Sequence, residues 1–274
     1  MNEQPLSPNH PAAPAETAGA GRGEVAALAA LGALALLFLW KIALTNRVLA
    51  GVDVFAYFYP YRDAVAEALR AGRLPLWNPY LFMGAPLLAN SQAAALYPLH
   101  WPLLALEAPR QVAWSIVLHL WLAAAGTFLL ARRALHLSLP AALLAGAVLG
   151  LGGFLGAQVE HLNQLNASAW LPWLLLCVEG ALPAGRRRLP ALLAGGGVAG
   201  LTLLAGHTQA AYIVLAAAGV YGLLRGWHDL RQRRWLRGLR GVAAVAAAAL
   251  IGSLLAAGQL LPTLELSGLS TRSG

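Results

Sequence analysis

Two carboxylates and a set of aromatic rings follow the first long apolar run of the chain, in the stretch GVDVFAYFYPYRDAV (51–65). A carboxylate can take a proton from a hydroxyl group within about 3 Å, and aromatic rings can pack on the apolar face of a sugar or on lipid. Asp53 is therefore the candidate general base, with a solvated loop acid as the alternative. Asp63 is expected to form an ion pair with arginines of its own helix.

Other candidate substrate-binding side chains lie where later apolar runs end on the same side as Asp53. They are acids, imidazoles, an amide and one arginine: Glu160, His161, His207, Gln209, Glu265 and Arg272. The segment around Asp53 adds Arg62, Tyr57, Tyr59, Trp77 and Asn78. Helix caps, ordinary loop residues and an aromatic belt at a membrane interface are the structural alternatives. No cofactor motif is present, and the need for a divalent metal stays open.

The composition indicates that lipid surrounds much of the chain. Of 274 residues, 59% are hydrophobic and 11% charged, with a mean hydropathy of +0.62. The net charge of +8 does not indicate nucleic acid, because the cations form short clusters between apolar runs. The single cysteine, Cys177, excludes a disulfide within the chain. Motifs for nucleotide-driven pumping and for the common hydrolases are absent from the sequence.

The elements that position these residues are predicted to be transmembrane helices. Residues 1–24 are rich in Pro, Ala and Gly and predict a disordered cytoplasmic tail; residues 25–274 form one membrane domain. Seven apolar runs predict about seven spans, at 25–44, 111–131, 139–157, 165–182, 189–206, 209–224 and 242–262. The fold class is thus all-α, a polytopic membrane bundle. Glycines spaced as GxxxG, at 146/150, 152/156 and 196/200, predict close packing between helices.

Arginines predict the orientation of these spans. They cluster after the second, fourth and sixth runs, so these loops and the N-terminus are expected in the cytoplasm. The first outer loop, about 45–110, then faces outward. Its segment 61–74 predicts an amphipathic helix on the membrane surface. Its apolar segment 86–106 predicts either an eighth span or, because prolines interrupt it, short helices in the outer interface.

Several stretches resemble one family of membrane proteins. DVFAYFYPYRDAVAEALRAGRLPLWNPYLFMGAPLLAN (53–90) and YPLHWPLL (97–104) resemble the first outer loop of the bacterial YfhO-type proteins. The resemblance continues with HLNQLNASAWLPWLLL, GHTQAAY and QLLPTLELSGLSTR, and covers about residues 40–272. These proteins look like part of the GT-C superfamily of multi-span glycosyltransferases. The resemblance therefore implies a seven-span GT-C-like core with interfacial helices in the first outer loop.

The resemblance also implies an activity. A protein of this kind sits in the bacterial inner membrane and takes a sugar from a polyprenyl phosphate on the outer face. The acceptor is an envelope glycopolymer or a lipid, and Asp53 stands at the position of the catalytic acid of the first loop. Arg62 or Arg272 could meet the phosphate. The alternatives are a transporter or lipid flippase, a scaffold without chemistry, and a truncated, inactive family member, because such proteins usually run longer.

Overall fold

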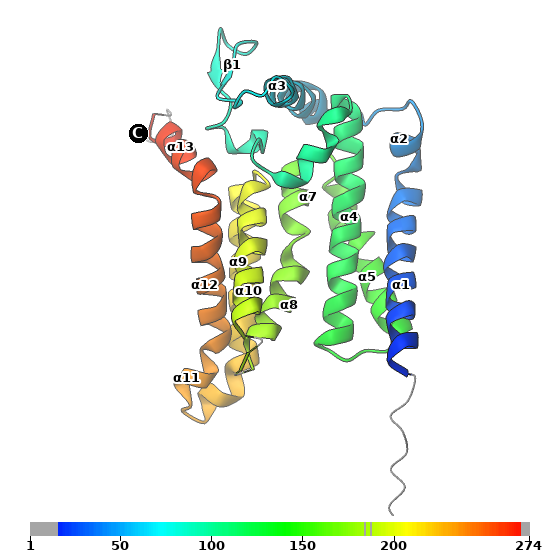
Figure 1. Ribbon diagram of the computed structural model, residues 1–274, viewed down its shortest axis with the longest axis vertical. Coiled ribbons are helices and arrows are strands. Elements are labelled where there is room, and N and C mark those ends of the chain that lie inside the picture. Colours follow the sequence, from blue (N-terminus) through cyan, green and yellow to red (C-terminus); the bar gives the residue numbers. More distant parts are fainter. Residues whose placement is uncertain (1–15, 184, 187, 270–274) are drawn as a thin grey trace, which may run out of the picture.

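A computed structural model describes residues 16–183, 185–186 and 188–269 as a bundle of helices (Figure 1). Four of its helical segments are long and apolar enough to cross a membrane. They are α1 (Glu16–Phe38), α4 (Ala108–Arg133), α10 (Thr208–Arg231) and the segment Leu139–Ala157, which comprises α5 (Leu139–Gly150) and α6 (Gly153–Ala157). A fifth candidate is the pair α12 (Arg240–Leu255) and α13 (Ala257–Gly268), which bends by 81°. The lengths and composition of these helices are consistent with a membrane protein.

The predicted seven-helix core is not confirmed by these lengths. The run 165–182 is divided between α7 (Leu162–Ser168) and α8 (Leu171–Ala181). Pro172 lies in the first turn of α8, and a proline disfavours helical backbone in the residue before it. The helix α9 (Arg188–Leu204) is apolar but, with 17 residues, is shorter than the four candidate spans.

Small residues let the helices approach closely. A Cβ added to Gly150 would lie 2.9 Å from the carbonyl oxygen of Leu120 on α4, and one added to Gly200 would lie 3.4 Å from that of Gly252 on α12. Both contacts confirm the packing predicted from GxxxG spacing. The pair 152/156 does not pack in this way, because a Cβ on Gly156 would meet no atom within 4 Å.

The segment between α1 and α4 covers one end of the bundle, at the top of Figure 1. It contains α2 (Trp40–Leu44), the π-helix η1 (Val54–Phe58), α3 (Tyr59–Arg70), the hairpin β1 (Trp77–Asn78) and β2 (Ala85–Pro86), and the 3₁₀ helices η2 (Ser91–Ala93) and η3 (Pro98–Ala105). These short helices confirm the prediction for residues 86–106. An eighth span is wrong, because residues 86–106 form only the helices η2 and η3, of three and eight residues, which are too short to cross a membrane.

The covering segment is fixed to the bundle by contacts far apart in sequence. The Asn163 side-chain NH₂ group donates to the carbonyl oxygen of Gln92 at 2.6 Å. Gly206, with φ of +90°, leaves no room for a Cβ, which would lie 2.6 Å from the Ser91 carbonyl oxygen. Glycine at this position therefore allows the turn between α9 and α10 to touch η2.

The helix α3 confirms the amphipathic prediction for segment 61–74, with one correction. Ala64 and Ala68 are buried on its inner face, as the pattern predicted, and Leu69 is half-buried. Arg62 was expected on the polar face but is also buried, at 4% exposure. Arg62 can be buried because its guanidinium group has a hydrogen-bond partner inside the protein, His100.

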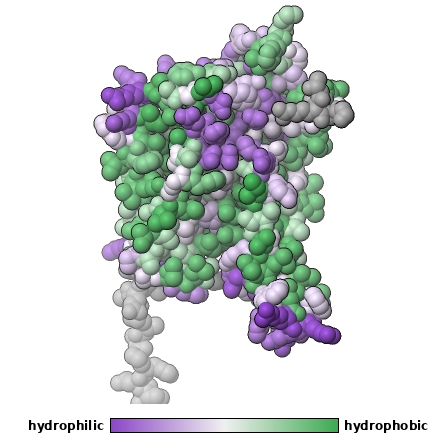
Figure 2. Space-filling model, turned by 180° about the vertical axis from the view of Figure 1, so that it is seen from behind, coloured by the Kyte–Doolittle hydropathy of each residue, from purple (hydrophilic) through white to green (hydrophobic). Residues whose placement is uncertain are grey.

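The opposite end of the molecule carries the arginine-rich turns. Glu24, near the start of α1, pairs with Arg132 at 3.5 Å and Arg133 at 3.8 Å at the end of α4. The short helix α11 (Trp235–Gly238) lies at this end too (Figure 1). Figure 2 shows hydrophilic residues gathered at the two ends, with mainly hydrophobic surface between them. The helix α1 begins at Glu16, so residues 16–24, which were predicted to belong to a disordered tail, are helical. Residues 1–15 lie outside the described residues.

Candidate functional site

Asp53 lies at the exposed end of the bundle, where the chain leaves α2 and enters the continuous helix 52–70. Its side chain is 60% exposed, and its Oδ2 lies 3.9 Å from Nε2 of His161. A carboxylate in the first turn of a helix also interacts favourably with the helix dipole. Asp53 is thus accessible, and it has an imidazole as its neighbour.

Glu160 and His161 come to this place from the turn before α7. A Cβ on Gly51 would lie 2.9 Å from Oε2 of Glu160, so the absence of a side chain at Gly51 admits that carboxylate. Both Glu160 and His161 are exposed. One polar cluster therefore forms from two segments that are far apart in sequence, residues 51–53 and 160–161. We call it the outer cluster.

His207 joins the outer cluster from the turn between α9 and α10. Its Nδ1 accepts the backbone N–H of Ala210 at 3.0 Å and caps α10. The proton of the neutral ring is then on Nε2, which can donate to a ligand. Burial lowers the pKa of His207, and the neighbouring His161 lowers it further. Gln209 lies in the next helical turn and is exposed.

The aromatic candidates have different surroundings. Tyr59 is buried, and its hydroxyl donates to the Leu49 carbonyl oxygen at 2.8 Å, so it has a structural partner. Tyr57 exchanges hydrogen bonds with Asn90 and stacks on Tyr61, with ring centroids 4.2 Å apart. Burial raises the pKa of Tyr57. Trp77 is exposed on β1, whereas its neighbour Asn78 is buried.

Two charged candidates, Arg62 and Glu265, do not join the outer cluster. Arg62 is buried and bonded to His100, so the phosphate contact expected of it is not available in this arrangement. Glu265 is exposed on α13. Arg272 lies outside the described residues. The ion pair expected for Asp63 is wrong: Asp63 has no ion-pair partner among the described residues, because Arg62 turns inward and Arg70 bonds the carbonyl oxygens of Leu104 and Leu106.

A buried polar network lies beneath the covering segment, and the sequence did not single it out. Nη2 of Arg62 donates to Nε2 of His100 at 2.8 Å. Oγ of Ser115 on α4 lies 3.1 Å from the same nitrogen, and Nδ2 of Asn166 on α7 lies 3.2 Å from it. Because Nε2 accepts, the proton of the neutral His100 ring is on Nδ1. Burial lowers the pKa of His100 well below its usual value, and Arg62 lowers it further.

The network continues through Tyr97 and His119. Nε1 of Trp170 donates to the Tyr97 hydroxyl at 2.8 Å, and this hydroxyl lies 2.6 Å from Nε2 of His119. Nδ1 of His119 lies 2.7 Å from the Ser115 carbonyl oxygen, which fixes the proton on Nδ1 and makes Nε2 the acceptor. The four residues therefore form one directed chain of hydrogen bonds. The stretch YPLH at 97–100 could have indicated the network, because its Tyr and His lie in an apolar segment and buried polar groups need hydrogen-bond partners.

Arg62 is an unusual member of this network, because no carboxylate pairs with it in the described part of the chain. Burial lowers its pKa to about 9. A buried cation without a counter-ion is costly unless its donors are satisfied. We therefore assign Arg62 a positioning role: it fastens α3 to η3.

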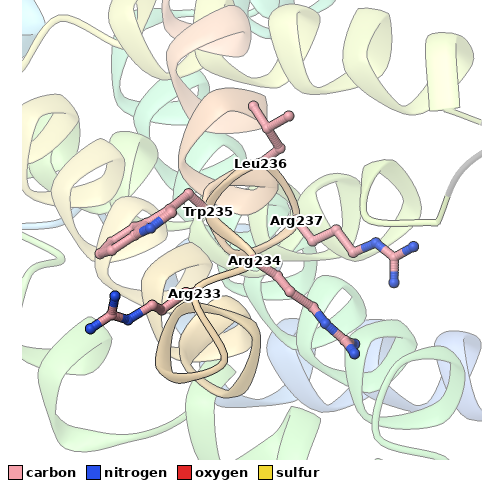
Figure 3. Close-up of a pocket in the computed structure, with 5 residues that line it drawn as sticks. All are labelled: Arg233, Arg234, Trp235, Leu236 and Arg237. Atoms are coloured by element: carbon pink, nitrogen blue, oxygen red, sulfur yellow. The ribbon is translucent and has the colours of Figure 1, made fainter.

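A further cavity lies at the other end of the molecule. It has a volume of about 530 Å³ and is lined by five consecutive residues of the turn between α10 and α12 (Figure 3): Arg233, Arg234, Trp235, Leu236 and Arg237. Figure 3 shows Arg233 and Trp235 pointing to one side and Arg234 and Arg237 to the other. This splayed turn suits a membrane surface rather than the enclosure of a substrate.

The arrangement of acids and imidazoles also bears on metal binding. Among the described residues, no group of three or more His, Cys, Asp or Glu side chains has the arrangement of a metal site. The outer cluster is therefore best described as an exposed acid beside imidazole donors. No family model, curated protein or solved structure matches this chain.

Proposed function

We propose that this protein is an integral membrane glycosyltransferase. It moves a sugar from a polyprenyl-phosphate donor to a cell-envelope acceptor, at the extracytoplasmic face of the bacterial inner membrane. In this proposal its N-terminus is cytoplasmic, and the end covered by residues 45–107 faces outward. The first-loop motifs that resemble the YfhO-type proteins support this class of reaction.

The observation that carries the proposal is the convergence of Asp53, Glu160, His161 and His207 at one exposed end of an apolar bundle. A lipid-linked donor keeps its reacting phosphate at the level of the membrane interface. A base for such a substrate must therefore be accessible at the ends of the membrane-spanning helices. Asp53 meets this requirement, since it is exposed and the Arg-rich turns lie at the other end.

The proposed step is a displacement at the anomeric carbon. Asp53 takes the proton of the acceptor hydroxyl, whose oxygen forms a bond to the anomeric carbon. The bond from that carbon to the phosphate oxygen breaks, and the electron pair leaves with the phosphate. His161 and the Nε2–H group of His207 are the described donors that can stabilise the leaving phosphate.

The direct test uses the purified chain in detergent with a radiolabelled polyprenyl-phosphate sugar and a membrane extract as the acceptor. Transfer of label into acid-stable product that depends on the protein is the expected result. Absence of transfer with every polyprenyl-phosphate sugar tried would contradict the proposal.

A lipid flippase or transporter is the second candidate, and the broken helices favour it. The chain bends by 81° between α12 and α13, and α7 and α8 are interrupted after Ser168. Transporters commonly place discontinuous helices at their substrate site. Protein-dependent movement of a fluorescent polyprenyl phosphate across liposomes, without sugar transfer, would support this second function.

A further inference from the structure

A second polar cavity lies between α3 and the β1–β2 hairpin, which are neighbours at the top of Figure 1. Its volume is about 240 Å³, and its polar and aromatic lining comes from Tyr61, Asp63, Glu67, Asn78 and Tyr80. A smaller cavity of about 50 Å³ adjoins it, shares Glu67 and Tyr80, and adds Arg73 and Trp77. Pockets for drug-sized ligands are usually about 300–1,000 Å³, so the main cavity suits a single ring rather than a long chain.

The carboxylates in this cavity differ in their partners. Asp63 and Glu67 are one helical turn apart on α3, so both reach the same side of the helix. The Tyr80 hydroxyl donates to Oε2 of Glu67 at 3.1 Å and holds the hairpin against α3. Asp63 has no ion-pair or hydrogen-bond partner among the described residues, so both of its oxygens can accept bonds from a ligand.

Asn78 is another polar side chain of this cavity that can contact a ligand. Its side chain is buried, with the residue only 4% exposed, and it lines the cavity. Its Oδ1 accepts the backbone N–H of Tyr80 at 3.0 Å, whereas its NH₂ group donates to no described residue. The Nδ2 atom is not fully enclosed by the protein, so an acceptor atom of a ligand in the cavity can reach it and take its hydrogen bond.

Tyrosine rings complete the lining. The Tyr61 ring is held in place by stacking on Tyr57, and Tyr80 is held by Glu67. Flat rings of this kind pack against the C–H face of a sugar, while carboxylate and amide groups bind its hydroxyls. Two carboxylates line the main cavity, whereas Arg73 lines the adjoining smaller cavity and not the main one, so the main cavity disfavours anionic ligands.

We infer that the cavity between α3 and the hairpin binds one neutral or amino-bearing sugar ring, through Asp63, Asn78 and the rings of Tyr61 and Tyr80. Cavity and outer cluster belong to one helix, 52–70, since Asp53 stands at its start and Asp63 in its middle. The bound ring is the acceptor saccharide of the proposed transfer, and this part of the inference rests on the proposed function. Binding itself does not depend on it.

The test is binding of the full-length protein, in detergent, to a printed array of bacterial envelope saccharides with neutral, amino-bearing and acidic members. We expect the wild type to bind neutral or amino-bearing members. Asp63→Asn should weaken binding to the best of them by about tenfold or more, because a hydrogen bond to a charged group is lost. Asp63 is exposed and has no described partner, so this variant should fold normally. Glu107→Gln is the matched control, an exposed acid of the same segment outside the cavity.

Each outcome has a defined meaning. Binding to no saccharide, binding to acidic members alone, or equal binding by Asp63→Asn and the wild type would overturn the inference. The transfer assay is run separately on the same variants. If saccharides bind but no label is transferred, the inference that the cavity binds a sugar is supported and the glycosyltransferase proposal fails. If transfer occurs and Asp63→Asn leaves the KM for the acceptor unchanged, the assignment of the cavity to the acceptor fails.

Discussion

At the residue scale, Asp53 carries the proposed chemistry. Asp53→Asn keeps the size of the side chain but removes its proton affinity. A positioned general base contributes about 10²–10⁴-fold, so sugar transfer should fall by that factor. Donor binding should change little, because the base acts on the acceptor. The measurement is the initial rate of label transfer by purified protein, with Glu107→Gln as a control that should behave like the wild type. If Asp53→Asn retains full activity, Asp53 is not the base.

His100 supports a second prediction at this scale, on stability. Its folded-state pKa lies well below 6.5, because burial and Arg62 disfavour the charged ring. Below about pH 6.5 the imidazole of His100 binds a proton in the unfolded chain but stays neutral in the folded protein. The free energy of unfolding is therefore highest at neutral pH and falls as the pH decreases. One such group can remove up to about 1.4 kcal/mol per pH unit.

The measurement is thermal unfolding in detergent at several pH values from 7.5 to 5. His100→Gln should lower the midpoint at neutral pH, because it disturbs the bonds to Arg62 and Ser115. It should also make the remaining pH dependence shallower than that of the wild type. His228→Gln, an exposed histidine at the other end, should leave the slope unchanged. An unchanged slope in His100→Gln would contradict the buried, neutral ring.

At the element scale, close helix contacts depend on individual glycines. A Cβ on Gly222 of α10 would lie 2.7 Å from the backbone carbon of Gly241 on α12, whereas one on Gly219 would meet no atom within 4 Å. Gly222→Ala should therefore destabilise the bundle by about 1–3 kcal/mol through overpacking. Gly219→Ala should be neutral or stabilising by up to about 1 kcal/mol, because alanine is the better helix former. Thermal midpoints that fall equally in both variants would show that α10 and α12 are not packed in this way.

The turn between α10 and α12 is predicted to anchor the protein at anionic lipid. Arg233 and Arg237 have no ion-pair partner among the described residues, and Trp235 and Leu236 are exposed beside them. Each arginine near an anionic membrane surface contributes about 1 kcal/mol. Arg233→Gln with Arg237→Gln should reduce correctly oriented protein, with the transfer rate per inserted molecule unchanged. Arg47→Gln, an exposed arginine at the other end, is the control. Loss of rate in correctly inserted protein would refute a purely anchoring role.

At the scale of the whole molecule, the orientation can be tested with single cysteines in a Cys177→Ala background. Met83 is fully exposed at the tip of the hairpin, and Gln232 is exposed at the arginine-rich end. We expect a membrane-impermeant maleimide to label Met83→Cys in intact cells and Gln232→Cys only after the membrane is opened. The reverse pattern would invert the proposed topology.

The helical class of the protein and the broken helices of its covering segment could be predicted from local patterns in the sequence. Apolar composition and runs of helical length predicted a helical membrane protein, because few water-soluble folds can bury so much apolar surface. Prolines at 98 and 102 predicted that the segment 86–106 would not form a continuous span, because proline breaks helix hydrogen bonding. These are local properties, so they could be inferred without knowing the neighbours of each residue. The number of spans was less predictable, since breaks such as those after Ser168 and Leu255 depend on packing.

Tertiary structure decided which polar residues meet. Arg62 and His100 are 38 residues apart, and His100 and Asn166 are 66 apart, so no local pattern predicts their contact. The amphipathic pattern of α3 placed Arg62 on the polar face. It is buried because His100 on η3 accepts its hydrogen bond, and Ser115 on α4 and Asn166 on α7 in turn contact His100. Likewise Asp63 was predicted to lie in an ion pair, and its partner-free place in a cavity arises only when the hairpin folds against α3. Burial of a polar group depends on partners brought together by folding, and that information lies in the arrangement of the helices rather than in any one segment.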